Sequence, residues 1–475
     1  MTSKNEISEE LASRMNSALS LKIGNDDLDE STSQSENESD SEWETMSESE
    51  WSISDSDWSI GGDTESGSDT EEEFSASSAS SATPSLLQWS DEIRSAKVCP
   101  FKLKPGLKES CGKSPVDFFK LLFTRSLFEF IVNNINNYAM KIINQSHQGR
   151  RFKEVTVNEF YVFFGLILNI GTMNSNVVDD YWRTRPLVEN PEDFMSPVRF
   201  GVILKCLNFE HELPGKNNKM SKISHMIDYF NIIMRKVVNP DKVLCIVESM
   251  TVPCYEHVYL LIDEFDLVHK LVVYQSDEKP GPYVAKSLLE DKLDVGHSIY
   301  ISDDYNSLEL TKFLIDRNTY VTGPIKRKRF GVLEEVKDKP LENLEKIVKY
   351  NADGICVTKW KDRREIIMIS SEYSGEWLTY KVNKQKIKKP ICVLEYNKYR
   401  DSFEKCNEIM GLYYFSCGEK THTTNKYKRL GVHILQILVL NAYILYKKYG
   451  GESMSLIDFR TVVVKHLLSH GKRRI

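Results

Sequence analysis

Four carboxylates in three short segments are the side chains with which this chain of 475 residues could do metal chemistry. They are Glu248 in C-I-V-E-S-M, Asp303 and Asp304 in S-D-D-Y-N-S-L, and Glu404 in a third segment that begins at Tyr396. Carboxylate oxygens are hard ligands that suit Mg²⁺. The competing interpretation is that all four are solvated or salt-bridged surface residues.

Each segment resembles a block of the piggyBac transposase family, where the patterns run S-I-D-E-S-M, D-N-F-Y-T-S-L and Y-N-x-x-x-G-G-V-D-x-x-D-Q. In this overlay Val247 and Ser302 occupy the positions of the first two aspartates, and Glu404 occupies the third. The resemblance implies chemistry in which convergent carboxylates hold two divalent metal ions. Valine cannot ligate Mg²⁺ and serine is a poor substitute for aspartate. The sequence therefore predicts a catalytic site that is lost and binds no metal.

The neighbouring carboxylates offer an alternative. Glu248 follows Val247, and Asp303 follows Ser302, but a shift of one residue along a strand turns the side chain to the opposite face. At the end of a strand the backbone can bend, so Asp303 or Asp304 could still reach the site. In that case the protein would be a divergent Mg²⁺-dependent transposase or nuclease that uses these residues with Glu404.

The charge of the chain is divided unevenly. Residues 1–95 hold 24 acidic against four basic residues, a net charge of −20, and the remaining 45 acidic and 58 basic residues give +13. A basic body favours a polyanion such as DNA as partner. The acidic, Ser-rich tail has too little apolar surface to fold and is predicted to be disordered. Its Trp43, Trp51 and Trp58, each preceded by an acid, are candidate anchors for protein partners.

Two groups of cations are the candidate DNA contacts. The first is Lys326, Arg327, Lys328 and Arg329, within a G-P-I-K-R-K-R stretch that is similar to a further block of the family, and the second is Lys384, Lys386, Lys388 and Lys389. Such residues contact phosphates without reading the base sequence. The first group and Lys472-Arg473-Arg474 also suit nuclear import, which predicts a nuclear protein. An exposed, solvated loop is the competing interpretation.

The elements that must position these residues follow from periodicity. Apolar residues recur at helical spacing between 115 and 240, and short β-branched runs at 243–247, 267–274 and 298–302 alternate with helical patterns at 283–293 and 308–317. A hairpin is expected at 355–370, a buried helix at Leu430–Tyr446 and an amphipathic helix at 456–468. The run at 430–446 is shorter than a membrane span and carries polar residues, so no membrane is expected.

These patterns predict an α/β protein, and the resemblance implies an RNase H-like transposase core with a β-rich insertion, preceded by a mostly helical domain. The predicted division is a disordered acidic tail at 1–95, a helical dimerisation or DNA-binding domain at 96–240, core at 241–318, insertion at 319–390, and core with C-terminal helices at 391–475. A homodimer is a further expectation. No cysteine follows Cys417, so the cysteine-rich zinc domain of the family is not expected.

The function predicted from these observations is that of an inactive, transposase-derived protein that binds DNA or chromatin in the nucleus. Two alternatives stay open at this point. One is the metal-dependent enzyme described above, and the other is a protein-interaction scaffold without a nucleic-acid role.

Overall fold

The structure is a computed structural model, and it describes residues 89–94, 97–146, 152–171, 182, 190–210, 221–249, 256–275, 281–327, 334–382, 385–400, 426–451 and 453–471. All of them belong to one compact unit, Leu87–Ile475. The acidic tail up to residue 88 lies outside the described residues. The predicted domain boundaries at 240, 318 and 390 fall inside this unit and stay predictions.

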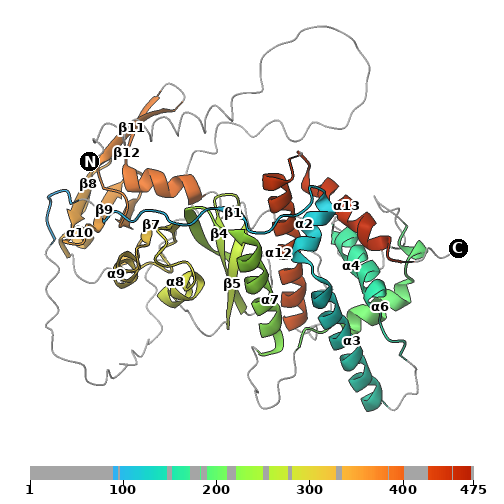
Figure 1. Cartoon of the computed structure of the whole chain (residues 1–475). Coiled ribbons are helices and arrows are strands. Elements are labelled where there is room, and N and C mark those ends of the chain that lie inside the picture. Colours follow the sequence, from blue (N-terminus) through green and yellow to red (C-terminus); the bar gives the residue numbers. More distant parts are fainter. Residues whose placement is uncertain are drawn as a thin grey trace, which may run out of the picture. The chain divides into compact units, whose positions relative to one another are not determined.

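Helices form most of the described residues between 97 and 240 and after residue 425 (Figure 1). They are α2 (Pro115–Leu122), α3 (Arg125–Ser146), α4 (Val157–Gly171), the 3-10 turn η1 (Pro191–Asp193), α6 (Pro197–Cys206), α7 (Ser221–Val237), α12 (Lys426–Tyr449) and α13 (Leu456–Leu468). Their starts follow from the sequence. At α2, for example, Ser114 and Asp117 form a reciprocal capping box and Pro115 takes the first helical position.

An eight-stranded sheet forms the middle of the chain, in the order β5-β4-β3-β6-β7-β10-β9-β8. The strands are β3 (Val243–Ser249), β4 (Glu256–Asp263), β5 (Val268–Gln275), β6 (Ser298–Tyr300), β7 (Tyr320–Pro324), β8 (Lys346–Tyr350), β9 (Cys356–Lys361) and β10 (Glu365–Ser370). β3, β6 and β7 are parallel, and the other pairings are antiparallel. Four strands of the predicted insertion, β7 to β10, therefore continue the same sheet.

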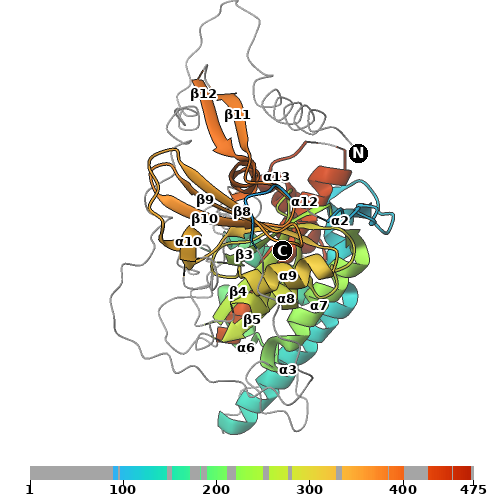
Figure 2. The ribbon, with the colours of Figure 1, turned by 90° about the vertical axis from the view of Figure 1, so that its left-hand side faces the viewer.

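The remaining elements lie around this sheet. α8 (Pro282–Leu289) and α9 (Leu308–Asp316) connect the strands of its first half, and α10 (Glu334–Asp338) precedes β8. A short pair joins β1 (Gly106–Leu107) to β2 (Val238–Asn239). β11 (Trp377–Val382) and β12 (Gln385–Pro390) form a separate two-stranded ribbon (Figure 2). A helical segment at 391–400 follows the ribbon.

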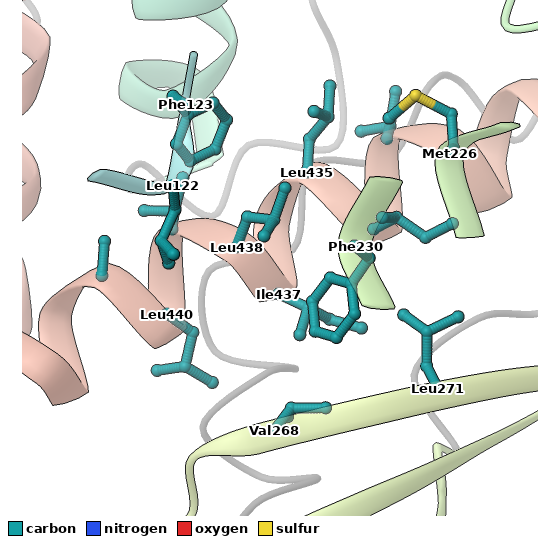
Figure 3. Packing of buried hydrophobic residues seen from close by; sticks show 14 of the residues in the cluster. Leu122, Phe123, Met226, Phe230, Val268, Leu271, Leu435, Ile437, Leu438 and Leu440 are labelled. Carbon is teal, nitrogen blue, oxygen red and sulfur yellow. The ribbon is translucent and has the colours of Figure 1, made fainter. Parts of the chain in front are cut away.

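The two faces of the sheet belong to different apolar clusters, because alternate residues of a strand point to opposite sides. Cys245 and Val247 of β3 join the large cluster that includes α2, α7 and α12. Leu244 and Ile246 join a second cluster with α8 and α9. Figure 3 shows the first cluster, where α12 packs against Phe230 of α7 and against β5.

Helix α12 is long and apolar enough to cross a membrane by length and composition, but 78% of its apolar window is buried inside the protein. It is the central helix of the large cluster, as its contacts with α2 and α7 show. The predicted buried helix at 430–446 is therefore confirmed, with bounds about one turn wider at the N-terminal end.

Two asparagine side chains, the buried Asn441 and the half-buried Asn231, form hydrogen bonds with the open edge of strand β5. Asn441 of α12 accepts a hydrogen bond from the Val268 N–H at 3.0 Å and donates one to the Val268 carbonyl at 2.8 Å. Asn231 of α7 does the same at Leu271, with distances of 2.9 and 3.0 Å. Each amide thus pairs with the backbone as a neighbouring strand would, which satisfies groups that an edge strand leaves open.

Candidate functional site

Val247 lies in the central strand β3 and points into the apolar cluster between the sheet and the helices. Its exposed fraction is 4%, and its cross-strand neighbour Leu260 is fully buried. On the same face, the next inward-facing residue is Ser249, whose hydroxyl lies 3.1 Å from Nε2 of the buried His433. The first motif position therefore offers only methyl groups to its surroundings.

Glu248 lies on the opposite face of the sheet. Its carboxylate forms a short hydrogen bond with His257 Nδ1 and accepts a hydrogen bond from the Tyr305 hydroxyl at 3.3 Å. Burial and then the Glu248 charge raise the pKa values of the Tyr305 and Tyr259 hydroxyls well above their usual range. Alternation along β3 thus separates this carboxylate from the Val247 side, as the sequence predicted.

The second motif begins directly after β6 and forms a tight turn, in which the Tyr305 N–H donates to the Ser302 carbonyl at 3.3 Å. The Asp304 carboxylate forms an ion pair with Lys326. The Asp303 charge acts on Tyr396, because burial and then Asp303 raise the pKa of that phenol above its usual range. Asp304 also raises the pKa of Tyr396, and Tyr396 belongs to the apolar cluster of Val247.

The third motif begins in the helical segment 391–400, which lies against β3. Tyr396 is 3% exposed, and Cys245 of β3 is among the groups that raise the pKa values of Tyr396 and Tyr399. The structure therefore brings the beginnings of all three motifs together around the first turn after β6 and the middle of β3. Glu404 itself lies outside the described residues.

The side chains around this point do not fit a pair of Mg²⁺ ions. Within the described ranges, no three His, Cys, Asp or Glu side chains converge in a way that could hold a metal ion. Val247 has no donor atom, Glu248 points away, and Asp304 is paired with a lysine.

Two residues of the basic stretch after β7, Lys326 and Arg327, make contacts within the protein. Lys326 contacts Asp304, as described, and the Arg327 guanidinium donates a hydrogen bond to the Lys337 carbonyl. Lys328 and Arg329 lie outside the described residues. The assignment of these four residues to DNA stays a prediction, and the structure gives two of them contacts within the protein.

Comparison with known proteins decides the family. A family model described as Transposase IS4 matches residues 114–443, well over half of the chain. The chain belongs to the transposase IS4 family. A solved structure described as the cryo-EM structure of a piggyBac transposase synaptic complex with hairpin DNA is similar over 77% of this chain and 83% of that chain. Its TM-score is 0.65 at 17% identity. This likeness establishes a piggyBac-type, RNase H-like transposase fold.

Two family-like motif residues make contacts that hold the turn after β6 in place. Asn306, in S-D-D-Y-N-S-L, is fully buried and donates to the Gly323 and Pro324 carbonyls at 3.2 and 3.0 Å. A Cβ atom on Gly323 would lie 2.1 Å from the Ile301 carbonyl oxygen. These contacts fix the turn after β6 against β7. Sequence reasoning recorded the motifs but missed these roles, since both depend on strands far apart in the chain.

Proposed function

We propose that this member of the transposase IS4 family binds DNA and does not cleave or join it. The observation that carries the proposal is Val247, which is buried in an apolar cluster at the position where the resemblance requires a metal-binding aspartate. A metal ion there would face methyl groups, and the desolvation of an ion without ligands is very costly. Glu248, on the other side of the sheet, does not replace the missing ligand.

DNA binding is supported by the net charge of +13 outside the acidic tail and by the similar solved structure, which is described as a complex with hairpin DNA. Phosphate contacts by lysine and arginine need no metal and survive the loss of the catalytic carboxylates. Nuclear localisation, protein partners of the acidic tail and homodimerisation are proposals that rest on the sequence alone.

The decisive experiment incubates the purified full chain with supercoiled plasmid and with pre-cleaved DNA ends, in Mg²⁺ and in Mn²⁺. We expect DNA to be bound and neither nicked nor joined, while an active piggyBac transposase assayed beside it gives both products. Metal-dependent products that disappear in the Asp303→Asn variant would refute the proposal. Binding that is negligible and insensitive to salt would favour the scaffold alternative instead.

A metal-dependent enzyme is the second candidate, because the second motif lies close enough to Tyr396 of the third motif for the charges of Asp303 and Asp304 to raise its pKa. It would need Asp304 to leave Lys326, and it would need Glu404 to approach Asp303. Calorimetric titration of the full chain with Mn²⁺ tests this candidate. Saturable binding in the wild type that is absent from the Asp303→Asn and Glu404→Gln variants would support it.

A further inference from the structure

Lys346 of β8 and two lysines of the ribbon β11–β12, Lys388 and Lys389, differ in their partners from several lysines elsewhere in the fold. Elsewhere the fold pairs such lysines with carboxylates, as in Lys242–Glu372 at 2.7 Å, Lys292–Asp291 at 2.7 Å, Lys349–Asp91 at 3.0 Å and Lys359–Glu365 at 3.1 Å. Across the described part of the chain, no carboxylate oxygen lies within 4.0 Å of the ammonium groups of Lys346, Lys388 or Lys389. The nearest described acids, Glu376 for Lys346 and Asp362 for Lys389, raise the lysine pKa values without forming an ion pair.

These lysines lie against two tryptophans. The ammonium groups of Lys346 and Lys388 lie 4.6 and 4.9 Å from the centre of the Trp377 ring, and that of Lys389 lies 5.7 Å from the centre of the Trp360 ring. Lys346 also donates a hydrogen bond to the Gly375 carbonyl. Stacking on the rings holds the ammonium groups in place while leaving them able to donate to an anion.

The surroundings withdraw water from two of these ammonium groups. Burial lowers the pKa values of Lys346 and Lys389, and for Lys346 the positive charge of Lys388 acts in the same direction. Partly desolvated cations without a carboxylate partner raise the local positive potential. An anion that approaches them gains more than it would beside freely hydrated lysines.

The ribbon itself concentrates further positive charge. Its sequence between Trp377 and Pro390 holds five lysines and no acidic residue. Among the described strands, these two pair only with each other, and a two-stranded ribbon is marginal in water without a partner surface. The major groove of duplex DNA, about 12 Å wide, admits a ribbon of this kind.

We propose that Lys346, Lys388 and Lys389, arranged around Trp377 and Trp360, bind the phosphate backbone of duplex DNA, with the ribbon β11–β12 directed toward the major groove. We call these five residues the lysine–tryptophan surface. The inference rests on the proposed DNA binding and deepens it, because it moves the main contact away from the stretch at 326–329. Phosphate contacts carry no base information, so binding here depends little on DNA sequence.

The test measures the affinity of the full chain for a labelled DNA duplex by fluorescence anisotropy over a range of salt concentrations. The variant carries Lys346→Gln, Lys388→Gln and Lys389→Gln. The matched control replaces three exposed lysines on helices, Lys120, Lys205 and Lys465, by glutamine and removes the same charge. A Lys→Arg version of the first variant keeps the charge at the surface.

We expect the first variant to bind at least about tenfold more weakly at low salt, and its slope of log K against log salt to fall by about one unit per lost phosphate contact. The control should stay within about twofold of the wild type, and the arginine version should bind more tightly than the glutamine version because it keeps the charge. Circular dichroism confirms folding. If Lys346→Gln unfolds the ribbon, the double variant Lys388→Gln, Lys389→Gln is measured in place of the triple variant. The slope of log K against log salt should then change by about two.

Two results would overturn the inference, and they differ from each other. If the wild type binds DNA and the first variant loses no more affinity than the control, the lysine–tryptophan surface is not the contact and the proposed function stands. If the wild type does not bind duplex DNA at any salt concentration, the proposed function fails and the inference fails with it.

Discussion

Replacing Val247 by aspartate restores the residue that the resemblance expects at the first motif position, and it tests whether the pocket for a metal ion still exists. The site is 4% exposed and lined by the apolar cluster. Full burial raises the pKa of a carboxyl group by about 3 to 5 pH units. Each unit corresponds to about 1.4 kcal/mol. We therefore expect ionisation at neutral pH to cost about 4–7 kcal/mol, a large part of the stability of a typical domain.

The pH dependence of this cost has a defined sign. The carboxyl group of Val247→Asp titrates near pH 4 in the unfolded chain and at a raised pKa of about 7 to 9 in the folded protein. The folded state then binds the proton more tightly, so stability is retained below about pH 4 and lost as pH rises through the folded pKa. Val247→Asn has the same shape without the charge and should show no such loss.

The assay is urea denaturation of the wild type and both variants between about pH 5 and about pH 8. The free-energy difference between the aspartate and asparagine variants should grow steadily over this range. The reasoning would be refuted if the two variants were equally stable at the upper end. It would also be refuted if Mg²⁺ stabilised only the aspartate variant, by about 2.7 kcal/mol at a hundredfold excess over Kd.

Three further variants test the supporting contacts. Asn441→Leu leaves two buried backbone groups of β5 unpaired, so the free energy of unfolding measured with urea should fall by about 2–6 kcal/mol. The control Asn239→Ala removes one exposed hydrogen bond and should lower this free energy by less than about 1 kcal/mol. Burial lowers the pKa of His433 from 6.5 to about 4. Because the unfolded chain then binds the proton more tightly, the free energy of unfolding of the wild type should fall by about 3 kcal/mol through His433 as the pH drops from about 7 to about 4. The free energy of unfolding of His433→Gln should depend less on pH over this range. The Cβ of Gly323→Ala would lie 2.1 Å from a backbone oxygen, so this variant should lose at least about 2 kcal/mol of stability, which a lower melting temperature would show. Its control, Gly201→Ala on the open side of α6, should be neutral or more stable by up to about 1 kcal/mol.

Much of the fold could be predicted from the sequence, because amphipathic periodicity is local. The predicted helix at 456–468 has the observed bounds, and the strands expected at 243–247 and 267–274 correspond to β3 and β5. The strand β4 was missed. Its residues 258–262 form a continuous apolar run that is buried on both faces, so the alternation that marks a half-buried strand is absent.

The site was predictable only where it depends on neighbours in the chain. The opposite orientations of Val247 and Glu248 follow from strand geometry alone. The ion pair between Asp304 and Lys326 does not, because it requires β7 to lie beside β6 and so bring residues 22 positions apart into contact. Treated separately, Lys326 was predicted as a DNA contact, and Asp304 was a candidate metal ligand only in the enzyme alternative. In the structure each neutralises the other, which weakens both assignments.

The resemblance to the piggyBac transposases survives the altered motif positions because most matching residues stabilise the fold. Asn441 and Asn231 close the edge of the sheet, and Asn306 with Gly323 fixes the turn after β6. Replacing any of these leaves buried polar groups unpaired or forces backbones apart, with a penalty in stability. Exchange of a metal-binding aspartate for valine has no such penalty, since it removes a carboxylate that is costly to bury without metal. If the protein is inactive, as we propose, the loss of catalysis leaves the architecture intact, and the proposed basic surface still binds DNA.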